Sequence, residues 1–148
     1  MKILTCFLII LLTATTALGA GLKGILGIWN TEMGESKVAI LECGEKLCGK
    51  IIWLKNPVYT DNLEGKLGTT VIDNKNPDPA LRSRPVVGLQ ILDGFTAEDD
   101  NTWANGACYD PENGNTYRGK IHLAAPYRLE LRGYIGIPLF GRSSVWTR

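Results

Sequence analysis

Few residues in this sequence could act as a catalytic base or nucleophile. His122 is the sole histidine and no Gly-x-Ser-x-Gly motif occurs, so a Ser-His-Asp triad would have to use His122. Strand alternation places His122 on the same face as Arg118 and Lys120, which predicts a solvated surface position. A zinc site lacks a second histidine to complete its ligand set. We therefore expect neither a catalytic residue nor a metal site.

Paired carboxylates are the remaining route to an enzyme, because two acidic side chains can act as general acid and general base. The candidates are Asp73, Asp78, Glu98, Asp99, Asp100 and Asp110. Most have a structural explanation: Asp78 caps a helical turn, Asp110 begins a turn, and 98–101 is typical of a solvated loop. Neither spacing nor sequence context brings two of them together.

Three cysteines follow the N-terminal segment. Cys43 and Cys48 flank the turn 44–47 between two apolar runs, which could place them opposite each other in a hairpin. In an oxidising compartment we predict a disulfide between them, the alternative being two separate thiols. Cys108 is left over, and we interpret it as a small buried hydrophobic residue rather than a nucleophile.

Aromatic residues in strand-like runs are more informative. They are Trp29, Trp53, Trp103, Trp146, Tyr117 and Tyr134. Core packing explains any single ring, but a closed barrel of about eight strands can also enclose one small ligand. Arginines among the rings, such as Arg84, Arg132 or Arg142, could hold a ligand carboxylate, stack on an indole or close a barrel end over a tryptophan.

The elements that must position these side chains are short strands. Runs rich in Val, Ile, Trp and Tyr, separated by Gly-, Pro- and Asn-containing turns, indicate strands rather than helices. Their expected ranges are 27–31, 37–43, 47–54, 86–92, 103–109, 116–123, 128–134 and 142–147. The clearest alternation of polar and apolar residues is at 128–132. The sequence therefore predicts an all-β barrel or sandwich.

Two segments depart from this pattern. Residues 55–85 form a long excursion with four prolines, in which 78–82 predicts one helical turn, and such a loop is often a lid or a binding loop. The apolar segment 133–141 has a Gly and Pro spacing that forbids a helix. It is expected to plug one end of the barrel, with a ligand portal or a partner-binding patch as alternatives.

Charge and the N-terminus narrow the class further. Residues 1–19 have the pattern of a cleaved secretory signal peptide, with an apolar run too short to span a bilayer. Removing them takes away Lys2 and no acid, so residues 20–148 carry 15 basic and 15 acidic residues. This balance argues against a nucleic-acid partner. We expect a periplasmic or secreted single domain without a membrane anchor.

Several motifs together are similar to one bacterial family. They are Gly27-x-Trp29, the run from Cys43 to Ile51, Asn76-Pro77-Asp78-Pro79 with Arg82-x-Arg84-Pro85, Trp103-x-x-Gly106, the run from Tyr109 to Gly114 with Tyr117, and the ending from Arg132 to Arg148. The chain resembles the family of domain of unknown function 2147 over nearly all of 20–148. The resemblance implies an antiparallel calycin or lipocalin-like barrel in which Trp29 is covered by Arg142 or Arg148. It implies no catalytic residue.

These observations lead to three hypotheses. The first is a binding protein for a small hydrophobic or amphipathic ligand, without a cofactor, in which the 55–85 loop forms a lid or rim. Its expected cavity residues are Trp53, Arg84, Trp103, Tyr117 and Tyr134. The second is an envelope module with a solid barrel that docks a partner protein. The third is a hydrolase that uses loop carboxylates such as Asp73 or Asp78.

Overall fold

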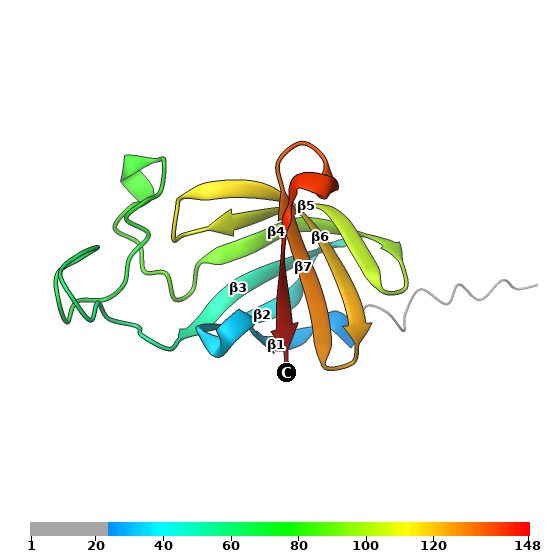
Figure 1. The fold of residues 1–148 in the computed structure, drawn as a ribbon, viewed down its shortest axis with the longest axis horizontal. Helices are drawn as coiled ribbons and strands as arrows, with labels where there is room; N and C mark the ends of the chain where they lie inside the picture. Colours follow the sequence, from blue (N-terminus) through cyan, green and yellow to red (C-terminus); the bar gives the residue numbers. More distant parts are fainter. Residues whose placement is uncertain (1–23) are drawn as a thin grey trace, which may run out of the picture.

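The computed structural model describes residues 24–148 and forms a closed antiparallel barrel in which each strand pairs with the next in the chain (Figure 1). The eight strands are β1 (Gly27–Asn30), β2 (Ser36–Cys43), β3 (Lys46–Leu54), β4 (Gln90–Asp99), β5 (Thr102–Asp110), β6 (Asn115–Ala125), β7 (Arg128–Tyr134) and β8 (Arg142–Thr147). Three single 3-10 turns occur, η1 (Glu32–Gly34), η2 (Pro79–Leu81) and η3 (Pro138–Phe140). The predicted signal peptide, 1–19, lies outside the described residues.

The prediction of a strand at 86–92 is wrong in its bounds. The structure places β4 at Gln90–Asp99, because Gly88 has a positive φ of 96° that interrupts an extended run. In this segment Val86 and Leu89 remain buried, and the backbone bonds to a neighbouring strand without forming part of β4, as in the bond from Gly88 N–H to the carbonyl of Ile51. β4 then continues through the acidic stretch, whose Ala97 pairs with Trp103.

One end of the barrel is filled and closed. Trp29 is fully buried, its Nε1 donates to the carbonyl of Ile25 at 2.8 Å, and the Arg148 guanidinium lies 4.3 Å from the ring centroid. Arg148 also donates to three carbonyls, those of Gly24, Leu26 and Pro126. Of the two arginines expected to cover Trp29, Arg148 does so, whereas Arg142 lies at the opposite end, paired with Gly133.

Above this closed end, large side chains fill the barrel because glycines make room for them. A Cβ on Gly106 or Gly119 would collide with the Phe95 ring, and at Gly119 it would also lie 2.5 Å from Cys108 Sγ. Phe95 is fully buried, as is Trp103 apart from 1% of its surface. The half of the barrel nearest Trp29 is therefore filled with side chains. Close packing of this kind leaves little room for a ligand there.

The disulfide between Cys43 and Cys48 is confirmed, with a Cα–Cα distance of 5.8 Å across the β2–β3 turn. Disulfides persist in oxidising compartments, so this bond supports the location of the chain in such a compartment. Within residues 24–148, no helix is long and apolar enough to cross a membrane.

Candidate functional site

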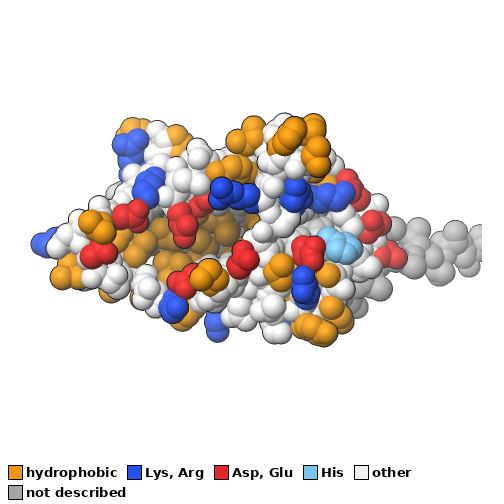
Figure 2. Space-filling view, in the orientation of Figure 1, with side chains coloured by type: hydrophobic (Ala, Val, Ile, Leu, Met, Phe, Trp, Pro, Cys, Tyr) orange, Lys and Arg blue, Asp and Glu red, His pale blue; other side chains and the backbone are white. Residues whose placement is uncertain are grey.

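A cavity of about 730 Å³ occupies the other half of the barrel and opens at the end opposite Trp29. We call this opening the mouth. Its edge is formed by η1, by the long β3–β4 connection and by the turn between β5 and β6. Figure 2 shows the hollow, with hydrophobic side chains inside it and acidic side chains around its edge. The second hypothesis required a solid barrel, and this cavity contradicts that part of it.

The interior of the cavity is mainly apolar. Inward-facing strand residues and the last part of the β3–β4 connection supply its lining, which includes Ile51, Leu54, Val71, Val86, Ile91, Leu92, Cys108, Tyr117, Leu131 and Trp146. Hydroxyl and amide groups are also part of the lining, from Thr31, Ser36, Asn56, Tyr109, Tyr117 and Ser144. A cavity of several hundred Å³ with such a lining is typical of small-molecule sites.

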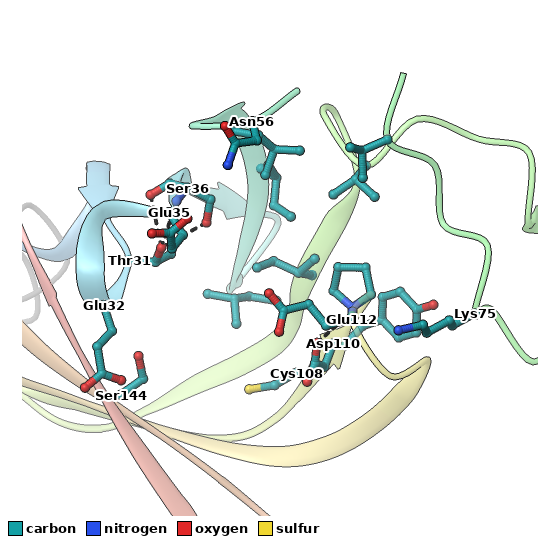
Figure 3. A pocket seen from close by; sticks show the side chains of 18 of the residues that line it. Thr31, Glu32, Glu35, Ser36, Asn56, Lys75, Cys108, Asp110, Glu112 and Ser144 are labelled. Carbon is teal, nitrogen blue, oxygen red and sulfur yellow. Dashed lines mark hydrogen bonds between the residues drawn. The ribbon is translucent and has the colours of Figure 1, made fainter. Parts of the chain in front are cut away.

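The mouth, in contrast, is rich in carboxylates. Among the described residues that line it are Glu32, Glu35, Glu64, Asp110 and Glu112, and Lys75 is the one cation of that set. In Figure 3, Glu32 lies beside Ser144 on one side, and Asp110 and Glu112 lie with Lys75 on the other.

Two of these carboxylates are neutralised by lysines. Lys75 bonds to Glu64 at 2.5 Å, which raises the pKa of Lys75, and Lys55 bonds to Glu35 at 3.1 Å. Asp110 instead accepts the side-chain amide of Asn113 within its turn. The mouth therefore carries a net negative charge, although the chain from 20 to 148 is balanced overall.

The β3–β4 connection is held in place by a buried carboxylate. Asp73 is fully buried and accepts hydrogen bonds from Arg84 Nε and Nη2 at 3.1 and 2.9 Å, from Asn76 at 2.8 Å and from the Tyr109 hydroxyl at 2.5 Å. Burial and the bond to Asp73 raise the pKa of Tyr109 to about 12. Because Tyr109 itself lines the cavity, this network joins the connection to the barrel wall.

A close backbone contact adds to this attachment. Gly114 has a φ of 75°, and a Cβ there would collide with the carbonyl oxygen of Lys75. The turn between β5 and β6 therefore rests directly on the long connection, as only glycine permits. Of the two roles expected for the 55–85 loop, the structure shows the rim.

Among the five expected cavity residues, only Tyr117 lines the cavity. Trp53 is a correction: it pairs with Lys37 on the outer surface, is 42% exposed, and has the Lys37 ammonium 5.4 Å from its ring centroid. Trp103 belongs to the filled half, and Tyr134 pairs with Arg118 on the outer face of β6.

The arginines expected to hold a ligand carboxylate are elsewhere too. Arg84 bonds to Asp73 behind the cavity wall, and Arg132 bonds to the backbone of 138–139. Neither they nor Arg142 line the cavity. His122 is exposed on β6, as alternation predicts.

Cys108 lines the cavity with its side chain but is not a reactive thiol. It is 8% exposed, and burial raises its pKa to about 12. A thiol that is protonated at neutral pH is a poor nucleophile. Its position in the apolar floor agrees with the interpretation of a small hydrophobic residue.

Sequence reasoning missed the acidic mouth. Asp110 and Glu112 have the sequence pattern of a turn, and they do form one. Glu32, Glu35 and Glu64 are spread over two other connections. Their common location becomes visible only once the topology places these connections at one end. The described residues, 24–148, contain no group of three His, Cys, Asp or Glu side chains that could hold a metal ion.

Comparison with known proteins agrees with this architecture. The model of the family DUF2147, described as "Uncharacterized protein conserved in bacteria", matches residues 27–148. Among solved structures, protein HP1028 from the human pathogen Helicobacter pylori, described as belonging to the lipocalin family, is similar to this chain with a TM-score of 0.69. The two are 22% identical, and the match covers 83% of this chain and 81% of HP1028. No curated protein matches the chain.

Proposed function

Because the chain belongs to the DUF2147 family, whose description assigns no activity, we propose its function from its own cavity: it is a periplasmic or secreted protein that binds a small, mainly apolar or amphipathic molecule. The observation that carries this proposal is the open cavity of about 730 Å³ with its apolar lining. The lipocalin-like fold of a similar structure agrees with it.

The cavity chemistry defines the ligand class. An apolar body would pack in the interior against Leu92, Leu131 and Trp146, and burying about 400 Å² of ligand surface there is worth about 10 kcal/mol. Immobilising the ligand offsets part of this gain, so affinities in the micromolar range are expected. At the mouth, the carboxylates disfavour an anionic polar end and favour a neutral or cationic one.

The carboxylates offered for a hydrolase have structural partners. Asp73 accepts bonds from Arg84, Asn76 and Tyr109, while Asp78 accepts the N–H of Ala80 and caps η2. Neither lines the cavity. We therefore place binding ahead of hydrolysis.

Native mass spectrometry of the protein purified from the bacterial envelope, with solvent extraction of the same sample, tests the proposal. We expect an adduct of one small molecule per chain, or stoichiometric uptake of an added neutral or cationic C12 amphiphile. The C12 carboxylate serves as the matched probe of equal length and is expected to bind at least about tenfold more weakly. A chain that carries nothing and takes up neither probe would overturn the proposal.

A further inference from the structure

The β7–β8 connection exposes an unusual amount of apolar surface. Within residues 134–141, here called the tip, the side chains of Ile135, Ile137, Leu139 and Phe140 are 73%, 53%, 74% and 78% exposed. Figure 1 shows the tip projecting from the end of β7, and Figure 2 shows a hydrophobic group at the same place. The sequence predicted a plug here, and the structure corrects this, because these side chains point away from the barrel.

The tip is fixed in this outward conformation. Arg132 Nε donates to the carbonyl of Pro138 at 2.6 Å, and its Nη2 donates to the carbonyl of Leu139 at 3.1 Å. A Cβ on Gly141 would lie 2.5 Å from the carbonyl oxygen of Gly133, so the two ends of the connection are in close contact. The apolar side chains are therefore presented to solvent by a built turn.

The tip stands at the mouth end of the barrel. In a barrel whose neighbouring strands are all antiparallel, the β1–β2, β3–β4, β5–β6 and β7–β8 connections lie at one end. Every large hydrophobic side chain that is more than 70% exposed among the described residues lies in these connections: Met33, Leu63, Ile135, Leu139 and Phe140. Met33 is held at a φ of 62°, a conformation that a non-glycine residue seldom adopts.

Cations surround the base of the tip. Arg118 pairs with Tyr134, and Arg142 pairs with Gly133, so both lie where the tip begins and ends. Both are exposed, and within residues 24–148 neither forms a salt bridge. Arg132 lies between them on β7. An apolar projection with unneutralised arginines at its base matches the order of groups in a phospholipid bilayer, where acyl chains lie beneath phosphates.

We propose that the tip docks on a phospholipid membrane, with Ile135, Leu139 and Phe140 entering the headgroup boundary and Arg118 and Arg142 contacting lipid phosphates. The mouth opens at the same end of the barrel beside the tip, so an apolar ligand could pass between bilayer and cavity with little exposure to water; this last step rests on the proposed function. A second copy is a poorer partner, since a two-fold contact through the tip would bring two sets of arginines together.

Co-sedimentation of the full-length mature protein with vesicles tests the docking. The vesicles are phosphatidylcholine alone, or phosphatidylcholine with phosphatidylglycerol. We expect binding to both, stronger with phosphatidylglycerol and weakened by 0.5 M salt. The triple variant Ile135→Ser, Leu139→Ser, Phe140→Ser is expected to lose at least about tenfold in partitioning, because it lacks the buried apolar surface. The control Leu41→Ser, Ile52→Ser removes exposed hydrophobic side chains from the outer wall and should bind as wild type does.

A charge variant and a soluble probe separate this proposal from the proposed function. Arg118→Gln with Arg142→Gln should weaken binding to anionic vesicles by about fivefold per arginine, and Lys46→Gln with Lys50→Gln should not. The triple tip variant should still take up the soluble amphiphile, which shows a folded chain with a working cavity. Sedimentation of wild type and tip variant to the same extent would overturn docking, as would a dimer held by the tip that ignores vesicles. Failure of amphiphile uptake alone would overturn only the cavity function.

Discussion

At the residue scale, burial decides the chemistry of the two side chains that most resemble catalytic groups. Cys108 and Asp73 are both buried, but Cys108 is neutral in an apolar floor and Asp73 is surrounded by donors. Each has a structural role in the barrel, and its contribution to stability can be measured.

The raised pKa of Cys108 predicts a loss of stability in alkali. Its folded pKa, about 12, exceeds the value of 9.0 for an exposed thiol, so the fold retains a proton that the unfolded chain releases. The contribution is complete below pH 9 and falls as pH rises from 9 toward 12, by a few kcal/mol in total. Urea unfolding at pH 8 and at pH 10.5 should show a larger decrease for wild type than for Cys108→Ala. Equal pH dependence in the two proteins would count against this assignment.

Substitution of Asp73 tests whether its role is structural. Asp73→Asn removes the charge that Arg84 faces and replaces an acceptor oxygen with a donor amide, so we expect a loss of about 2–4 kcal/mol in unfolding free energy. Proteolysis within 55–85 should also accelerate, because the network anchors this segment. Asp78→Asn, which retains an oxygen for the cap, is the control and should cost well under 1 kcal/mol. An unchanged melting temperature for Asp73→Asn would exclude the anchoring role.

At the element scale, the mouth is built by connections that touch one another. The β5–β6 turn rests on the β3–β4 connection at Gly114, where backbone meets backbone. The wall of the cavity therefore depends on a contact between two segments that are not neighbours in any sheet.

Alanine at Gly114 measures this contact against a matched glycine. Gly44 has a similar φ of 68° with open space around it, so Gly44→Ala bears only the left-handed strain of about 1 kcal/mol. Gly114→Ala adds the collision with Lys75 and should cost at least about twice as much, with increased hydrogen exchange in 55–85. Thermal denaturation of both variants gives the comparison, and equal losses would mean that the connection shifts freely.

Strand alternation separated the two faces of β6 correctly, because this strand is regular where it was applied. On β6, it placed Tyr117 inward and Arg118 and His122 outward, as the structure shows. The expected cavity position of Trp53 is wrong because a bulge at Ile52 turns Trp53 to the outside: one extra residue reverses every side chain beyond it. Bulges have no reliable signal in a single sequence.

At the scale of the whole molecule, the two ends of the barrel differ in structure: one is closed by Arg148, and the other opens into the cavity. The all-β class, the disulfide and the long excursion were predictable from the strand-like runs and the turn residues, and the barrel from the family resemblance. Which C-terminal arginine closes the barrel was not, because Arg142 and Arg148 occupy opposite ends of the same short strand. The sorting of acids to the mouth and arginines to the tip also depends on closure of the barrel, since the residues come from separate connections.

Arg148→Ala tests the separation of the two ends. Loss of three hydrogen bonds and of the contact with Trp29 should lower the unfolding free energy by about 1–3 kcal/mol. The affinity for an amphiphile should stay within about twofold of wild type while the protein is folded, because the cavity lies in the other half. Calorimetric unfolding and a binding titration on one sample check both statements.

The most direct test of ligand binding is a substitution that fills the cavity. Leu131 lines it, so Leu131→Trp places an indole in the ligand space, whereas Glu130→Trp puts the same ring on the outer face of the same strand. Calorimetric titration with the neutral C12 amphiphile should give one site in wild type and in Glu130→Trp, and at least about tenfold weaker binding in Leu131→Trp. Equal binding in all three proteins, or none in wild type, would contradict a ligand-binding barrel.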